Sequence, residues 1–374
     1  MGGNGVTPAI ESLAYVPHMT ARRAFVSGIA AMATACAIIV AAGISCAWAS
    51  DEAAAVGLRK DVVFTDYTPL SANAELIRRM LSPLAAAQLP AVEAQMDVRL
   101  SRQPVDLARE KFVLYVPPRA PKKGYGLLVF VAPWDDAALP PDWVPVLDQF
   151  GLILVEPVRS GNDQSLLGRR YPLALLAEYN VAQRYRLDPD RIFVTGFSGG
   201  SRVALRLALA YPDIFRGAIL NAGSDPIGDR DTPLPPADLF HRFQEAGHLV
   251  YVTGDRDIKN MSFDHASMHS LDSWCVFNVD FYAELSVAHD VMDPGVLARA
   301  LGLLSTPAHP DPARLAACRN GNEAELAGQF AEAESLLAQE KRDDARRKLI
   351  DIDARFGGLA APRSLTLFDR LGGN

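Results

Sequence analysis

Residues 196–200 read Gly-Phe-Ser-Gly-Gly, a pattern that can hold a serine nucleophile in a sharp turn. The apolar segment 191–195 runs directly into this motif, and a helix-forming segment runs directly out of it. A turn of this kind forces strained backbone angles on Ser198, so the residues two positions away must be small, as Gly196 and Gly200 are. The hydroxyl would then stand near a helix N-terminus, whose partial positive charge favours an anionic intermediate. The alternative interpretation is a glycine-rich turn that binds an anion.

A serine nucleophile needs a base and an acid that orients the base, which follow in the chain order Ser, Asp, His when this turn belongs to an α/β fold. Segment 249–253 predicts a strand, and Asp255 and Asp257 follow it, at the strand end where sites gather in open α/β sheets. Both are candidate acids. His289 is the best candidate base, because it lies in a loop between the last predicted strand and the next predicted helix.

The remaining histidines are weaker candidates. His241 and His248 precede the strand that carries the two acids, and His309 lies beyond the last predicted helix of the catalytic part. His265 and His269 are four residues apart on a predicted helix, a spacing that can hold a metal, but no third ligand is evident. We therefore expect two solvated helix histidines and no metal site.

An oxyanion hole would need two backbone N–H groups. One is that of Gly199. The other should come from the loop Ala-Pro-Trp-Asp-Asp after the third predicted strand, where Pro133 has no N–H and Trp134 is therefore the expected donor. Asp135 in this loop and Asn162 in the next open on the same face, and we expect them to contact substrate, although a plain turn explains the segment around Asn162 equally well.

The order of apolar segments predicts the fold class. Two early segments, at 92–100 and 111–116, predict strands, the first by strict alternation of apolar and polar residues. Continuous apolar runs then predict buried strands at 127–131, 152–155, 192–194, 218–220 and 249–252. Helical segments lie between them at 143–150, 171–185 and 201–211. This alternation indicates an α/β fold with a mostly parallel sheet and helices on both faces.

We expect four regions. Residues 1–49 form a signal peptide, 50–90 an N-terminal extension with a helix over 73–81 that Pro83 ends, 91–310 the catalytic domain, and 311–374 a C-terminal helical hairpin. The hairpin is expected because Ala, Glu and Arg dominate this last region with helical spacing.

The N-terminus predicts export. Arg22 and Arg23, a long apolar run and a final Ala-Trp-Ala give the three parts of a cleavable secretory signal, which can start at Met19. The arginine pair also resembles a twin-arginine signal. We expect a periplasmic or secreted protein without stable membrane insertion; the alternatives are an uncleaved membrane anchor and a lipid-modified Cys46.

Cleavage would leave two cysteines, Cys275 and Cys318. In an oxidising compartment such a pair favours a disulfide, and two buried free thiols are the alternative. The net charge of −7, with no basic run, argues against a nucleic-acid partner or an anionic membrane.

The strand-to-turn segment 191–200, the Gly-Asp-Arg-Asp turn at 254–257 and the loop around His289 together resemble secreted poly(3-hydroxybutyrate) depolymerases and feruloyl-esterase-like proteins of the α/β-hydrolase superfamily. The resemblance spans about residues 110–305. It implies the α/β-hydrolase fold and a triad that works without a cofactor, in which the acid, three residues after the glycine, is Asp257.

The sequence thus predicts an exported serine esterase that acts on a small-molecule or oligomeric ester through an acyl-enzyme on Ser198. Two alternatives remain. One is a serine peptidase of the prolyl-oligopeptidase type, although no propeller-sized region precedes the catalytic domain. The other is a binding protein that uses the same scaffold without catalysis.

Overall fold

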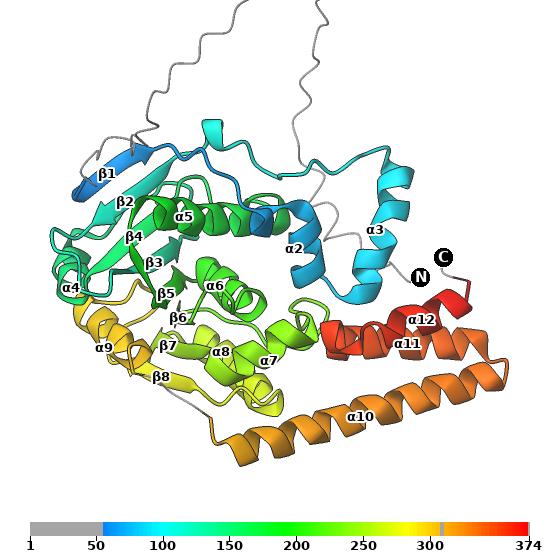
Figure 1. Cartoon of the computed structure of the whole chain (residues 1–374). Helices are drawn as coiled ribbons and strands as arrows, with labels where there is room; N and C mark the ends of the chain where they lie inside the picture. The colour runs from blue at the N-terminus through cyan, green and yellow to red at the C-terminus, as the bar shows by residue number, and fades with distance from the viewer. Residues whose placement is uncertain (1–54, 307–309, 373–374) are drawn as a thin grey trace, which may run out of the picture.

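Eight strands form one sheet in the computed structural model, which describes residues 55–306 and 310–372 (Figure 1). The expected signal peptide and His309 lie outside these residues. The spatial order is β1-β2-β4-β3-β5-β6-β7-β8, in which β3 to β8 are parallel and β2 is antiparallel to both of its neighbours. The strands are β1 (Gly57–Val62), β2 (Phe112–Val116), β3 (Tyr125–Val131), β4 (Leu152–Pro157), β5 (Leu187–Phe197), β6 (Gly217–Asn221), β7 (His248–Gly254) and β8 (Val279–Glu284).

Helices cover both faces of the sheet (Figure 1). The α-helices are α2 (Asn73–Met80), α3 (Pro83–Met96), α4 (Val144–Phe150), α5 (Tyr171–Arg184), α6 (Gly199–Ala210), α7 (Ala237–Ala246), α8 (Ile258–Ser273), α9 (Pro294–Leu304), α10 (Pro312–Ala338), α11 (Arg342–Phe356) and α12 (Arg363–Arg370). The described residues also form five shorter helices: η1 (Pro69–Ser71), η2 (Leu107–Arg109), η3 (Pro141–Trp143), η4 (Leu166–Arg170) and η5 (Gly357–Ala360).

The central strands are buried on both faces because each face has its own helical layer. In β3, Leu127, Val129 and Val131 pack into the core that α5 and α6 cover. Leu128 and Phe130 point the other way, into the core that α4 and α9 cover. This explains the continuous apolar runs in the sequence, since alternate residues of one strand fill two different cores.

Two elements near the N-terminus differ from the sequence prediction. The strand expected over 92–100 is wrong: most of that segment belongs to α3, and Asp97 ends the helix with left-handed backbone angles. The apolar and polar residues do alternate there, but the helix as a whole, Pro83–Met96, is rich in alanine, a strong helix former. The helix expected over 73–81 is confirmed as α2. Pro83, which was expected to end that helix, is also the first residue of the next helix, α3.

The sheet begins inside the segment expected as an N-terminal extension. β1 pairs with β2 at the sheet edge, and four of its six residues are exposed. Its sequence, Gly-Leu-Arg-Lys-Asp-Val, lacks apolar alternation because the strand is held by backbone pairing and buries little.

The C-terminal helices are packed on the catalytic domain and share its core. Phe330 of α10 and Leu349 and Phe356 of α11 belong to the same buried cluster as α5 and α6. The buried carboxylate of Asp353 in α11 accepts a hydrogen bond from the Leu84 N–H (3.0 Å), at the start of α3. This region therefore belongs to the fold of the whole molecule, and the expected helical hairpin is confirmed with one further helix, α12.

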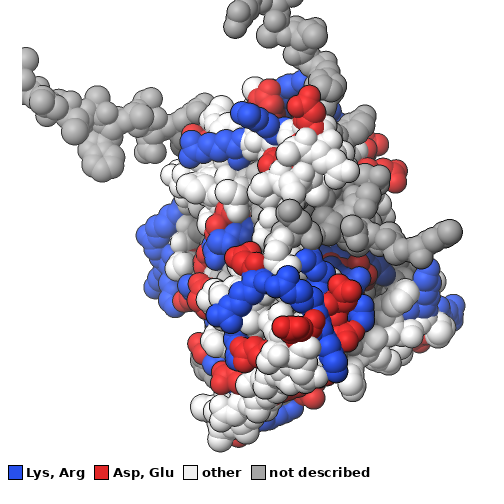
Figure 2. Space-filling model, turned by 90° about the vertical axis from the view of Figure 1, so that its right-hand side faces the viewer, with Lys and Arg blue, Asp and Glu red and all other residues white. Residues whose placement is uncertain are grey.

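The surface over these helices carries acidic and basic side chains next to one another (Figure 2). Several are paired between helices: Lys348 with Glu332, Arg355 with Glu325, and Arg363 with Glu334. No helix within the described residues is long and apolar enough to cross a membrane.

Candidate active site

Ser198 lies in the turn between β5 and α6, with φ 54° and ψ −119°. A residue with a side chain rarely adopts such angles, and tight packing of glycines around the turn imposes them. A Cβ atom on Gly196 would lie 2.4 Å from the Gly200 carbonyl carbon, and one on Gly200 would lie 1.9 Å from the Val131 oxygen. The spacing of the two glycines is thus a steric requirement of the turn, as the sequence predicts.

The structure brings the three predicted triad residues together. His289 Nε2 lies 2.9 Å from Ser198 Oγ, and His289 Nδ1 lies 2.6 Å from Asp257 Oδ2. Ser198 precedes α6, Asp257 precedes α8 and His289 lies between β8 and α9, so all three stand at the carboxyl edge of the parallel strands. The His289 side chain is 41% exposed and that of Asp257 only 7%, so solvent reaches the base but not the acid.

The two candidate acids have different partners. Asp257 contacts His289, whereas the Asp255 carboxylate accepts a hydrogen bond from the Ser286 N–H (2.8 Å) in the loop after β8. Asp255 therefore fixes the loop that carries His289 without reaching the imidazole.

The environment of Asp257 favours its ionised form. Burial alone would raise the pKa of this carboxyl, but hydrogen bonds with His289 and Asn260 lower the pKa below its ordinary value. An ionised carboxylate can only accept, so the proton between the two residues belongs to His289 Nδ1. Nε2 is then unprotonated toward Ser198 in neutral His289, which is the tautomer of a general base.

An aromatic residue supports the imidazole. The centroid of the Phe197 ring lies 4.7 Å from that of the His289 ring and 6.0 Å from that of the Trp134 ring. Phe197 is 8% exposed, while Trp134 is 38% exposed. The site therefore has an apolar wall that runs from the base to the solvent-facing Trp134.

The predicted oxyanion donors lie in two adjoining segments. Gly199 is the first residue of α6, so its N–H has no partner within the helix. Trp134 follows β3, and among the described residues no backbone carbonyl group accepts a hydrogen bond from its N–H. The Asn162 amide lies against Gly199, because a Cβ atom there would be 2.1 Å from Asn162 Oδ1.

The loop that carries Trp134 is braced by the loop after β4. The Pro133 and Asp135 carbonyl groups accept hydrogen bonds from the N–H groups of Asn162 (3.0 Å) and Arg159 (2.7 Å). The Asp135 carboxylate, an expected substrate contact, accepts hydrogen bonds from the Gly161 N–H (2.9 Å) and from Gln164 Nε2. Its observed partners are thus within the protein, whereas the exposed Asn162 side chain stands at the open face.

Arg170 links the same two loops by hydrogen bonds to a carbonyl group in each. Its buried guanidinium donates to the carbonyl groups of Ala132 (3.0 Å) and Ser160 (2.8 Å). Desolvation lowers the pKa of Arg170 to about 10, so the group still carries its charge at neutral pH. A fixed positive charge therefore lies beneath the loop of the expected oxyanion donor.

The other histidines lie apart from this site. His248 pairs with Asp280 at the opposite end of β7 (2.8 Å), and the side chains of His265 and His269 are exposed on α8. Within the described residues, no group of three His, Cys, Asp or Glu residues is arranged to hold a metal ion.

Two residues beside the triad were not predicted from the sequence: Asn260, which contacts Asp257, and Arg202, which contacts Asn260. Asn260 Nδ2 donates to Asp257 Oδ2 (2.7 Å), and Arg202 donates to Asn260 Oδ1 (3.4 Å). A signal for Asn260 was present, because an amide three residues after an N-capping aspartate faces the same side of the first helical turn.

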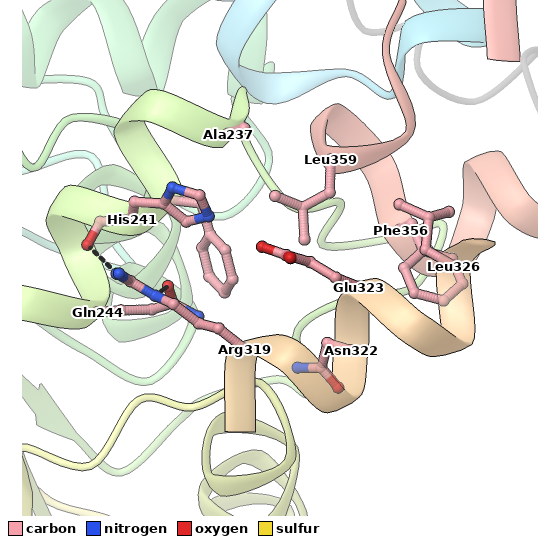
Figure 3. Close-up of a pocket in the computed structure, with 10 residues that line it drawn as sticks. Ala237, His241, Gln244, Arg319, Asn322, Glu323, Leu326, Phe356 and Leu359 are labelled. Atoms are coloured by element: carbon pink, nitrogen blue, oxygen red, sulfur yellow. Dashed lines mark hydrogen bonds between the residues drawn. The ribbon is translucent and has the colours of Figure 1, made fainter. Parts of the chain in front are cut away.

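The expected disulfide is present between Cys275 and Cys318, and it joins the end of α8 to α10. Close by, α7, α10 and η5 enclose a small pocket (Figure 3). In it, Arg319 donates to the His241 carbonyl group (2.8 Å) and the Glu323 side chain points inward. The pocket is lined by none of the triad residues; its lining is Ala237, Phe240, His241, Gln244, Arg319, Asn322, Glu323, Leu326, Phe356 and Leu359.

The chain is similar to known esterases over short stretches, and no protein-family model matches it. Over 99 residues, 23% of the chain, it is 29% identical to poly(3-hydroxybutyrate) depolymerase of Ralstonia pickettii. Over 54 residues, 14% of the chain, it is 43% identical to NocK of Nocardia uniformis subsp. tsuyamanensis, which is described as an esterase. These matches span 20% and 14% of the length of the two relatives.

Among solved structures, S-formylglutathione hydrolase FrmB of Staphylococcus aureus matches 53% of this chain and 90% of its own, with 14% identity and a TM-score of 0.42. Other matches include a ferulic acid esterase and a puromycin-hydrolyzing peptidase. The order of the parallel strands, the antiparallel β2 and the serine turn after β5 confirm the predicted fold. The chain therefore has the α/β-hydrolase fold and, over two short stretches, is similar in sequence to a poly(3-hydroxybutyrate) depolymerase and an esterase.

Proposed function

We propose that the protein is an exported serine hydrolase that cleaves carboxylic esters through an acyl-enzyme on Ser198. The observation that supports this most directly is the continuous hydrogen-bonded chain from Ser198 Oγ through His289 to Asp257, with distances of 2.9 and 2.6 Å. This is the arrangement that activates a serine hydroxyl, which is a weak nucleophile when it stands alone.

In the proposed reaction, His289 Nε2 takes the proton of Ser198 as Oγ attacks the ester carbonyl carbon. Asp257 holds the imidazole in this tautomer and stabilises the imidazolium. The N–H groups of Gly199 and Trp134 stabilise the oxyanion of the tetrahedral intermediate, close to the positive end of α6.

The intermediate then collapses as His289 returns the proton to the leaving alcohol, so that the alcohol departs and the acyl group remains on Ser198. Water attacks this acyl-enzyme, again with His289 as base, and the carboxylic acid is released. Each step uses side chains and backbone groups of the chain itself, and the proposal requires no cofactor.

The proposed substrate class is a small-molecule or oligomeric ester. The half-buried Ser198 and the 41% exposed His289 side chain leave the reacting atoms open to solvent. Asn162, whose amide lies against Gly199, is a proposed contact for the carbonyl side of the substrate, and the exposed ring of Trp134 is a proposed apolar contact. A poly(3-hydroxybutyrate) chain is one candidate, because a relative is named for that activity.

The test compares p-nitrophenyl esters of short and long acids, aromatic and hydroxyalkanoate esters, and peptide amides as substrates. We expect ester turnover that falls by three or more orders of magnitude in Ser198→Ala, because loss of a triad member leaves only binding and oxyanion stabilisation. Ser201→Ala is the matched control: Ser201 is the next serine along the chain, is buried in the first turn of α6, and its hydroxyl has no hydrogen-bond partner among the described residues. Ser198→Ala activity within tenfold of wild type would contradict the proposal, and cleavage of amides alone would favour a peptidase.

Export is the second part of the proposal and rests on the sequence of residues 1–49 and on the disulfide. We expect N-terminal sequencing of periplasmic protein to begin at Ser50. A mature form that retains Arg22 would indicate a membrane anchor instead.

A further inference from the structure

Asn260 belongs to the same hydrogen-bonded group as the triad. It lies in the first turn of α8 and is 9% exposed. Its side-chain Nδ2 donates to Asp257 Oδ2 (2.7 Å), and its backbone N–H lies 3.4 Å from Asp257 Oδ1. Both carboxylate oxygens of Asp257 therefore face the same residue, and Oδ2 is shared between Asn260 and His289.

Arg202 fixes which end of the Asn260 amide faces Asp257. A guanidinium can only donate, and Arg202 directs one N–H at Asn260 Oδ1 (3.4 Å) while its Nε donates to Asp225 (3.0 Å). The amide oxygen must therefore face Arg202, and the amide NH₂ group must face Asp257. The hydrogen-bonding pattern, rather than the atom labels, determines this orientation.

The orientation also affects His289. Asn260 Nδ2 lies 3.1 Å from His289 Nδ1, but both nitrogens carry hydrogens that point at Asp257 Oδ2, so neither can accept from the other. A carboxylate oxygen held by two donors has little freedom to rotate. The imidazole proton then stays on the side of Asp257, and Nε2 stays free for Ser198.

We propose that Asn260 is a positioning residue of the triad, which holds the Asp257 carboxylate in the rotamer that orients His289. This inference rests on the proposed function, since it concerns the same serine, histidine and aspartate. Asn260 acts through Asp257 and does not touch the reacting atoms.

The experiment measures kcat and KM of Asn260→Ala on a p-nitrophenyl ester from about pH 5 to 9. Because the carboxylate loses its second side-chain donor, we expect kcat to fall about 10- to 100-fold with KM within about threefold of wild type. The amide also partly neutralises the carboxylate charge. Its loss should strengthen the attraction between Asp257 and the imidazolium, so the acid limb of kcat/KM should move to higher pH by about half a unit or more.

Among the other charged groups around the pair, only Arg202 loses a hydrogen bond in this variant, the one to Asn260 Oδ1, and its bond to Asp225 remains. These groups are Arg202 of α6, Asp225 of the loop after β6, Asp264 of α8, Asp255 at the end of β7 and Asp290 beside His289. Asp264 accepts hydrogen bonds from Ser224 and Thr253, and Asp255 accepts one from Ser286, so their partners do not change.

Two further variants separate positioning from folding. Asn260→Asp keeps the shape of the side chain but removes its hydrogen-bond donor to Asp257. We expect its kcat to fall and the acid limb of its kcat/KM profile to move to higher pH at least as far as in Asn260→Ala. Asn180→Ala removes another buried asparagine, which is bonded to Asp66 and Leu176, and should lower stability but leave the acid limb where it is.

An unmoved acid limb together with kcat within twofold of wild type, in either Asn260 variant, would overturn the inference. If Asn260→Ala does not fold by circular dichroism, Asn260→Asp decides. A wild-type enzyme that neither hydrolyses esters nor reacts with a fluorophosphonate probe would instead refute the proposed function.

Discussion

The two carboxylates that follow β7 offer a sharp test at the scale of single residues. Asp257→Asn keeps the shape of the side chain but cannot hold His289 in the tautomer that the proposed reaction needs, so turnover should fall by about 10⁴. Asp255→Asn loses part of a loop contact to Ser286, so it should cost on the order of 1 kcal/mol of stability and keep most of the turnover. Turnover and thermal unfolding of both variants check this, and the reverse pattern would assign the role of acid to Asp255.

The lowered pKa of Asp257 adds a prediction about stability against pH. Because the folded pKa lies below the ordinary value of 3.8, the ionised carboxylate stabilises the fold fully above that value, and this contribution is lost as the pH falls through the folded pKa. The free energy of unfolding of Asp257→Asn should therefore depend less on pH than that of wild type below about pH 4. Denaturant unfolding at several pH values between about 2 and 5 measures this, and parallel curves for the two proteins would contradict it.

The chemistry-bearing residues were predictable to different degrees. Ser198 and His289 were predicted because the turn and the loop that carry them have sequence signatures. These signatures can be recognised without any knowledge of the packing. Asn260 was not found, since its position three residues after Asp257 does not by itself show whether its side chain faces the acid or solvent. The role of Asn260 depends on the rotamer of Asp257 and on the position of the Arg202 side chain. The tertiary fold determines both.

At the scale of elements, the buried strands were predictable and the N-terminal elements were not. A strand in the middle of the sheet must be apolar on both faces, so β3 to β7 leave a strong signal in the sequence. β1 is an exposed edge strand, and it leaves almost none. In α3, alternation of apolar residues competed with alanine content, and the helix prevailed because Leu84 and Leu89 bury its inner side.

β4 carries a buried acid whose effect can be measured. Burial raises the pKa of Glu156 to about 8; one carboxyl oxygen accepts from the Ala138 N–H (3.0 Å), and the other has no hydrogen-bond partner within the part of the chain that the structure describes. A raised folded pKa means that stability is complete below the unfolded value of 4.5 and is lost as the pH rises to about 8. We expect Glu156→Gln, which cannot ionise, to be more stable than wild type at pH 9 by up to about 5 kcal/mol.

Thermal unfolding of wild type and Glu156→Gln at about pH 5 and pH 9 is the measurement. The difference between the two proteins should grow with pH, and a difference that is the same at both pH values would contradict the raised pKa. Glu178→Gln in α5 is a useful comparison, because burial raises that pKa to about 7 and the same trend should appear at slightly lower pH.

At the scale of the whole molecule, the C-terminal helices stabilise the catalytic domain through a shared core and one covalent link. The Cys275–Cys318 disulfide closes a loop of 43 residues, which in the chain-entropy model corresponds to about 4 kcal/mol as an upper value. We expect the double variant Cys275→Ala/Cys318→Ala to unfold at lower denaturant concentration but to keep its turnover, since neither sulfur contacts the triad. Equal stability of the variant and the oxidised wild type would contradict this, as would free thiols in periplasmic protein.

The proposed reaction depends above all on Ser198 being an activated nucleophile. The most direct measurement is reaction of the folded protein with a fluorophosphonate probe, followed by mass spectrometry of the labelled peptide. We predict one adduct, on Ser198, that is absent in Ser198→Ala and forms much more slowly in His289→Ala, because the base no longer accepts the proton from Oγ. A folded wild-type protein that stays unlabelled, or an adduct on a different serine, would contradict the role of Ser198 as the nucleophile.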